Sequence, residues 1–122
     1  MLDKNSMAGT VLGALREARG VIQSVIANEC GRSASYISQW ENRHLDIPEW
    51  LIEVYSRKID ISEAHIWDLI DFWNKEKQKY AVSNGGVLTL YTFEERAFNH
   101  IKNNYHQEPL NPRTRRNLNP RR

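Results

Sequence analysis

The stretch SASYISQWENR (33–43) has the pattern of a short amphipathic helix whose polar side is almost uncharged. Three large side chains recur at the spacing of one helical face: Tyr36, Ile37 and Trp40. Small or amide side chains fall on the other side: Ser35, Ser38, Gln39 and Asn42. Ser33 can cap the helix, because its hydroxyl can accept from a backbone N–H that lacks a partner within the first turn. Solvated helix faces ordinarily carry Lys and Glu, so this uncharged face indicates a surface that contacts something other than water.

Two helices are predicted before this stretch. Residues 7–19 place their apolar side chains on one face, and Gly20 ends that helix. Residues 22–30 form a second, shorter helix that ends at Gly31, since glycine is favoured just past a helix C-terminus. Two short helices joined by a tight turn with glycine, the second bearing a polar face, are typical of a helix-turn-helix unit.

Two more helices are predicted after it. Pro48 suits the first turn of a helix that ends near Ile59, because the missing N–H of proline has no helical partner there. Ser62 is a suitable N-cap for a longer helix that continues toward Tyr80.

The helical pattern is predicted to end at SNGG (83–86), the clearest break in the chain. VLTLYT (87–92) has the β-branched and aromatic composition of a strand. Thr92 and Glu95 form the pattern of a capping box, which predicts a last helix through FEERAFNHIKNNY (93–105). The segment from Pro109 holds little that can be buried, and we expect it to be disordered when unbound.

Composition limits the class of protein. A chain of 122 residues is expected to form one domain, and its single Cys30 excludes an internal disulfide framework. The chain has no apolar run near the roughly 20 residues of a membrane span and no secretion signal at its start, so we expect a cytoplasmic protein. The expected organisation is a helical domain at 7–82, a strand-helix extension at 83–108 and a basic tail at 109–122.

Charge is distributed unevenly along the chain. The tail contains five arginines and no acid, whereas the other 108 residues hold the remaining twelve Lys and Arg and all fifteen Asp and Glu. Residues 7–70 carry six basic and nine acidic side chains. Because non-specific DNA affinity comes mainly from phosphate neutralisation, such a domain needs local basic groups, dimerisation or the tail to bind DNA. The tail arginines that could follow phosphates or enter a minor groove are Arg113, Arg115, Arg116, Arg121 and Arg122.

Residues 10–70 resemble the Cro/CI-type (XRE-like) helix-turn-helix family of phage repressors and bacterial transcriptional regulators. The resemblance rests on LREARG (15–20), Gln23, Ile26-Ala27, Gly31, Ser33, YISQWEN (36–42), Pro48 and WLIEVYSRKIDIS (50–62). It implies a mainly α fold, with a five-helix lambda-repressor-like domain. It also implies a dimeric repressor that places the helix at 33–42 in the DNA major groove at a palindromic operator.

The resemblance assigns roles to individual residues. The positions that would face base edges are Ala34, Ser35, Ser38 and Gln39. Gln39 carries both a donor and an acceptor and can bind adenine at N6 and N7. The positions that would contact phosphates are Gln23, Asn42, Arg43 and His44. Arg32 has no such role in the family, but its side chain could also reach a phosphate. In the family Glu41 commonly pairs with a basic residue of the first helix, here Arg16, and we expect a surface ion pair that orients the helix.

This sequence departs from the family at two positions. Ile22 stands where a Ser or Thr N-cap is usual, and Arg32 replaces a small apolar residue between Gly31 and Ser33.

The aromatic residues of the C-terminal part allow two interpretations. Trp67, Phe72 and Trp73 either cover the first and fourth helices or form a dimer interface. The predicted strand lacks a partner within the chain, which favours the hypothesis that it pairs with its copy in a second subunit. The residues of the possible interface are Trp67, Phe72, Trp73, Val87, Leu88, Leu90 and Tyr91.

An alternative function is a protein-binding module, an antitoxin or antirepressor that holds a protein partner through residues 66–108. We expect no enzyme, because no nucleophile–base spacing or phosphate loop is present. We expect no cofactor and no metal site, since the four histidines lack a ligand spacing with Cys30.

Overall fold

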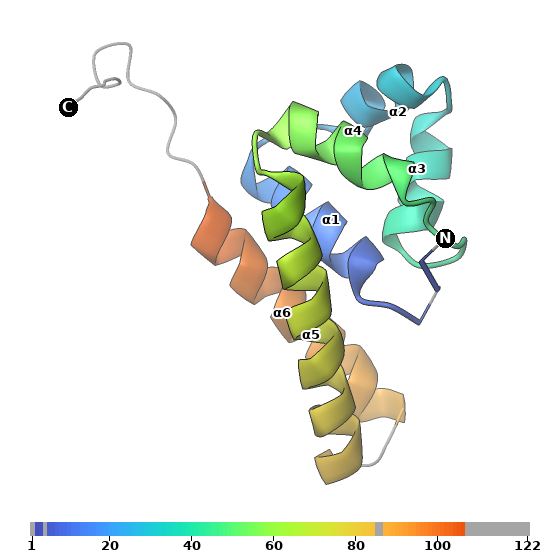
Figure 1. Ribbon diagram of the computed structural model, residues 1–122. Helices are drawn as coiled ribbons and strands as arrows, with labels where there is room; N and C mark the ends of the chain where they lie inside the picture. Colours follow the sequence, from blue (N-terminus) through green and yellow to red (C-terminus); the bar gives the residue numbers. More distant parts are fainter. Residues whose placement is uncertain (1, 4, 85–86, 107–122) are drawn as a thin grey trace, which may run out of the picture.

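A computed structural model describes residues 2–3, 5–84 and 87–106, and all of their side chains except those of 82–84 and 87–91. Six helices follow one another in the chain (Figure 1): α1 (Ala8–Ala18), α2 (Gln23–Cys30), α3 (Ala34–Glu41), α4 (Trp50–Ile59), α5 (Glu63–Asn84) and α6 (Val87–Tyr105). The described residues include one isolated β-bridge, between Leu2 and Ile47. The fold is therefore mainly α, as the sequence predicts.

Local sequence explains where most of the first five helices begin and end. Gly20 and Gly31 both adopt a left-handed conformation, with φ of 72° and 66°, which glycine reaches without steric cost. Ser33 caps α3 by accepting from the backbone N–H of Tyr36 at 3.2 Å, and Ser62 accepts from that of His65 at 3.2 Å. The predicted place of Pro48 is wrong: α4 begins at Trp50, and Pro48 lies just before it.

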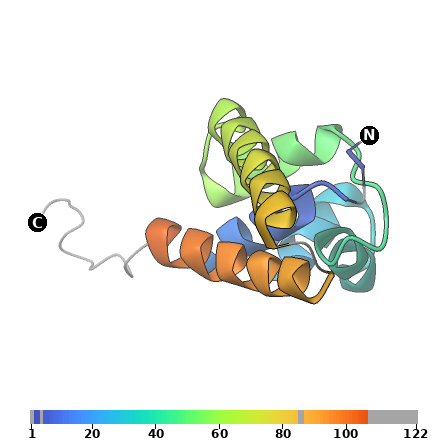
Figure 2. The same ribbon diagram turned by 90° about the horizontal axis from the view of Figure 1, so that it is seen from below.

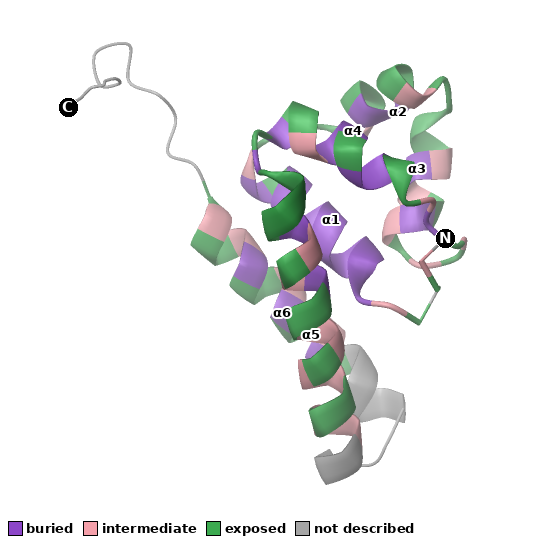
Figure 3. Cartoon of the chain, viewed as in Figure 1, coloured by how far each residue is buried: buried purple, intermediate pink, exposed green. Residues whose placement is uncertain are grey.

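α1 lies at the centre of the fold, in contact with α3, α4, α5 and α6. It is buried along most of its length (Figure 3), and α5 and α6 run along two sides of it (Figure 2). All six helices contribute side chains to the core that are at most 2% exposed, among them Leu12, Ile26, Ile37, Leu51, Ile66 and Ile101. Helices on several sides of one central helix bury apolar surface that none could bury alone.

The predicted strand at 87–92 is wrong, because these residues form the first part of α6. A helix satisfies its backbone hydrogen bonds internally, whereas a lone strand needs a partner, and the described residues offer none. Further along the helix, Phe93, Ala97 and Ile101 recur every four residues and belong to the same apolar core as α1. Thr92 therefore lies inside a helix and does not start one, and α6 packs as part of the domain.

Some predicted residues lie outside this description. The basic tail, with Arg113, Arg115, Arg116, Arg121 and Arg122, lies beyond the described residues. The side chains of Val87, Leu88, Leu90 and Tyr91, which were expected at a dimer interface, also fall outside the described ones.

Candidate nucleic-acid interface

The α2–turn–α3 unit fixes one side of α3 against the core. The turn at Gly31 is closed by backbone hydrogen bonds, the N–H of Arg32 donating to the carbonyl of Ala27 at 3.0 Å. Ile26 and Ala27 from α2 and Ile37 and Trp40 from α3 are buried. The opposite side of α3 is therefore directed away from the protein.

The four residues expected to face bases lie on α3 outside the core. Ala34, Ser35 and Gln39 are exposed and Ser38 is half-buried. They form two pairs at i, i+4 spacing, so each pair shares a helical face. The Nδ2 of Asn42 donates to Oγ of Ser38 at 3.1 Å, which ties Asn42 to the same surface. None of these side chains carries a charge.

An aromatic and cationic strip borders this surface. Tyr36 is half-buried and its ring meets that of Trp40 edge-on at 4.8 Å between centroids. The guanidinium of Arg32 lies 4.8 Å from the centroid of Tyr36, within the range of a cation–π contact. Tyr36 thus acts as a brace between the core and Arg32, which stays exposed beside α3.

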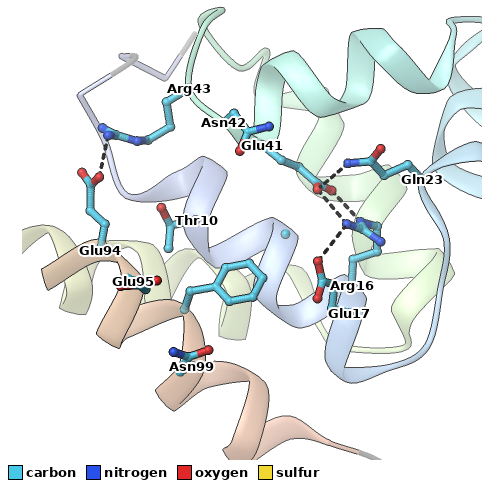
Figure 4. Close-up of a pocket in the computed structure, with 12 residues that line it drawn as sticks. Thr10, Arg16, Glu17, Gln23, Glu41, Asn42, Arg43, Glu94, Glu95 and Asn99 are labelled. Atoms are coloured by element: carbon cyan, nitrogen blue, oxygen red, sulfur yellow. Dashed lines mark hydrogen bonds and ion pairs between the residues drawn. The ribbon is translucent and has the colours of Figure 1, made fainter. Parts of the chain in front are cut away.

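Glu41 is the centre of a buried polar network (Figure 4). Arg16 donates to it twice, from Nε at 2.7 Å and from Nη2 at 2.9 Å. The Tyr55 hydroxyl donates at 2.5 Å and the Gln23 amide at 3.1 Å. Each carboxylate oxygen therefore accepts two hydrogen bonds, and the network joins α1, α2, α3 and α4. The predicted Arg16–Glu41 pair is confirmed, but its expected place at the surface is wrong, because both side chains are only 8% exposed.

Two glycines of α1 make room for this network. A Cβ on Gly13 would lie 3.2 Å from Oε1 of Glu41, and one on Gly9 would lie 2.7 Å from the carbonyl oxygen of Trp40. The end of α3 can approach α1 closely only because both positions lack a side chain. The spacing of Gly9 and Gly13 by four residues was a signal of this approach in the sequence.

Gln23 occupies the start of α2, where it was expected to contact a phosphate. Its amide nitrogen donates one hydrogen bond to Glu41, and a carboxamide nitrogen carries two protons. The second proton is available to an acceptor outside the protein. The network therefore orients Gln23 without using up its donor capacity.

Arg43 is directed away from the outward face of α3. Its φ is 65°, and its Nη2 lies 2.6 Å from Oε1 of Glu94 on α6. The other oxygen of Glu94 pairs with Nζ of Lys77 at 2.9 Å. His44, by contrast, is exposed. Arg32, Asn42 and His44 thus lie at the ends of α3, and Arg32 and His44 are exposed there, whereas Arg43 reaches α6.

A groove of about 560 Å³ runs between these elements (Figure 4). Gln23, Asn42 and Arg43 line it on the side of α2 and α3, and Glu94 and Glu95 line it on α6. No local pattern in the sequence indicates that α6 borders the predicted phosphate-contacting residues.

The aromatic residues of α5 have different environments. Trp73 packs on α6, with its ring centroid 5.9 Å from that of Phe93 and 5.5 Å from that of His100. Trp67 is half-buried against the core, whereas Phe72 is 51% exposed. Of the three, Phe72 presents the most free apolar surface.

No protein-family model matches the chain, and no curated protein or solved structure matches it significantly. No helix in the described part of the chain is long and apolar enough to cross a membrane. The described His, Cys, Asp and Glu side chains form no group of three or more that could hold a metal ion.

Tyr55 gives the network a measurable pH dependence. Burial, followed by the charge of Glu41 and the hydrogen bond to it, raises the pKa of Tyr55 well above its ordinary value of about 10. The folded state holds this proton more tightly than the unfolded state, so the stabilisation is complete below about pH 10. It is lost as the pH rises from about 10 toward the folded-state pKa. We expect the free energy of unfolding, measured in urea, to fall by up to about 1.4 kcal/mol per pH unit there.

Tyr55→Phe should remove this alkaline slope and lower the stability at pH 8 by about 1.5–3 kcal/mol, since a hydrogen bond to a charged group is lost. Tyr36→Phe is the matched control, because Tyr36 is half-buried and makes ring contacts. An unchanged alkaline slope in Tyr55→Phe would rule out this role of Tyr55.

Proposed function

We propose that the chain is a sequence-specific double-stranded DNA-binding transcriptional regulator of Cro/CI type, with α2 and α3 as its helix-turn-helix. The proposal rests on the outward face of α3, which carries no charged side chain. The other side of α3 is fixed by Ile37, Trp40 and the Glu41 network. Bases present neutral donors and acceptors in the major groove, at fixed positions for each base pair. A rigid helix with amide and hydroxyl groups suits that pattern better than one with Lys and Glu.

Gln39 is the main reader in this proposal. Its side chain is exposed and long enough to make the bidentate contact with adenine. Ser35 and Ser38 have short hydroxyls that discriminate weakly, and Ala34 offers a methyl group to the methyl of thymine. Phosphate contacts come from Gln23, Arg32, Asn42 and His44 at the edges of α3, because such contacts position a protein on the duplex.

Affinity in this proposal depends on a second copy of the chain. Residues 7–70 have more acidic than basic side chains, so one domain neutralises few phosphates. A homodimer that reads two half-sites of a palindrome about one helical turn apart doubles the contacts. In this proposal the dimer is a repressor of phage or mobile-element type that acts in the cytoplasm.

Selection of binding sites from random duplex DNA tests the proposal. We expect the wild-type chain to enrich a palindrome with adenine contacts, and Gln39→Ala to weaken binding to that palindrome by about 1–3 kcal/mol. Gln78→Ala is the matched control, since Gln78 is an exposed glutamine on α5, and it should leave binding unchanged. Equal enrichment of the same palindrome by Gln39→Ala would exclude Gln39 as a base-contacting residue.

A second candidate function is a protein-binding module of antitoxin or antirepressor type. It is favoured by the exposed Phe72 and by a groove of about 500 Å³ between α5 and α6, which Phe72, Trp73 and Tyr105 help to line. Exposed apolar surface of this kind often marks a protein interface. If the selection enriches no sequence at moderate salt, this function replaces the first.

A further inference from the structure

Arg43 adopts the left-handed backbone conformation of the residue just past a helix C-terminus, where the N–H of His44 closes the turn by donating to the carbonyl of Gln39 at 2.8 Å. Its φ of 65° lies in the left-handed region, where a residue with a side chain is disfavoured relative to glycine. The hydrogen bonds of this turn hold that conformation, since the N–H of Arg43 also donates to the carbonyl of Trp40 at 3.1 Å. Here the guanidinium bridges the end of α3 to α6 through the ion pair with Glu94.

Glu94 is well suited to hold that guanidinium. Its side chain is only 13% exposed, and its two oxygens accept from Arg43 at 2.6 Å and from Lys77 at 2.9 Å. Carboxylates and phosphates are both oxyanions that a guanidinium binds through charge-assisted hydrogen bonds. Glu94 therefore offers Arg43 what a DNA phosphate would offer it.

The position of the pair relates it to the DNA surface. Gln23, Asn42 and Arg43, three of the predicted phosphate-contacting residues, line one side of the groove in Figure 4. Glu94 and Glu95 line the other side. A DNA backbone that followed these three residues would meet two carboxylates of α6.

We propose that Glu94 is an internal substitute for a DNA phosphate and that the Arg43–Glu94 pair restrains DNA binding. This inference rests on the proposed function, because it concerns the regulation of the same surface. On a duplex, Arg43 exchanges Glu94 for a phosphate. The exchange does not require α6 to move, since α6 stays anchored through Phe93, Ala97 and Ile101. A ligand or protein that drew Glu94 away would strengthen DNA binding, and DNA would strengthen its binding in return.

The test measures the affinity of the full chain for a fluorescein-labelled 30-base-pair duplex of mixed sequence, at several salt concentrations from 50 mM upward. Glu94→Gln should bind about three- to ten-fold more tightly than the wild type, because Arg43 becomes available to a phosphate. The slope of log affinity against log salt should steepen by about 0.9, the value for one more neutralised phosphate.

Two control variants separate a specific restraint from a general effect of charge. Glu95→Gln changes the net charge equally at a neighbouring position in the same groove, and its affinity for the duplex should increase much less. In an Arg43→Gln background, Glu94→Gln should not increase the affinity for the duplex, because the increase requires the guanidinium of Arg43. Equal gains in both glutamate variants, or a gain that persists without Arg43, would overturn the inference.

The outcomes also separate this inference from the proposed function. If the wild type binds the duplex and Glu94→Gln binds equally well, the restraint is refuted and the function stands. If neither chain binds at 50 mM salt, the function fails and the restraint fails with it. Should Glu94→Gln not fold, the side-chain Nε–H resonance of Arg43 in the wild-type chain decides. It should shift when the duplex is added, and an unchanged resonance in the bound state would refute the exchange.

Discussion

Glu41→Ala should lower the free energy of unfolding by about 3–5 kcal/mol, the cost of removing one partner from a buried ion pair. Arg16 would keep its charge at a site where its side chain is 8% exposed. Burial by itself lowers the pKa of Arg16, but the hydrogen bonds and charge of Glu41 outweigh it and raise that pKa above its usual value. A guanidinium stays protonated at neutral pH even without a carboxylate partner, so Arg16 keeps its charge after the substitution and loses the carboxylate to which it donates twice.

Urea unfolding at pH 7 measures this cost. Glu29→Ala is the matched control, because Glu29 pairs with Arg57 and Lys58 at the surface, where ion pairs contribute little. It should leave the free energy of unfolding almost unchanged. Similar losses in the two variants would mean that the Glu41 network does not hold α3 in place. Because Glu41 ends α3, we also expect Glu41→Ala to weaken DNA binding, although Glu41 itself is turned away from the outward face.

The helices α2 and α3 and the turn between them could be predicted because their determinants are local. Gly31 at a left-handed turn, Ser33 as a cap and the spacing of Ile37 and Trp40 all act within a few residues of one another. The pairing of Arg16 with Glu41 was predictable from the resemblance alone, and its burial was not. That burial depends on Gly9 and Gly13 letting the end of α3 approach α1, which is a contact between distant segments.

The C-terminal part was mispredicted for the opposite reason. The β-branched and aromatic residues of 87–92 have a strand propensity, but such propensity depends strongly on context. The outcome is set by the repeat of Phe93, Ala97 and Ile101 against the core, and that packing surface belongs to other helices. For the same reason the sequence did not indicate that Glu94 meets Arg43, 51 residues away. The α2 and α3 side of the candidate site depends on local sequence determinants, whereas its α6 side depends on contacts between distant segments.

Ile101→Ala should lower the free energy of unfolding by about 2–5 kcal/mol, the range for truncating a buried isoleucine. Ile101 is 1% exposed and belongs to the core cluster that includes residues of α1. If α6 is part of the domain, urea unfolding of the variant should remain one cooperative transition at lower urea, because α6 and the other helices unfold together.

Ile22→Ala is the matched control, since Ile22 is 64% exposed and its truncation should cost almost nothing. Equal stabilities of the two variants, or a separate early transition in Ile101→Ala, would instead make α6 an extension that folds apart from 7–82. The result also bears on Glu94, because the restraint on Arg43 requires α6 to be held against α1. A chain in which Ile101→Ala loosens α6 should therefore bind duplex DNA more tightly than the wild type under conditions where it is still folded.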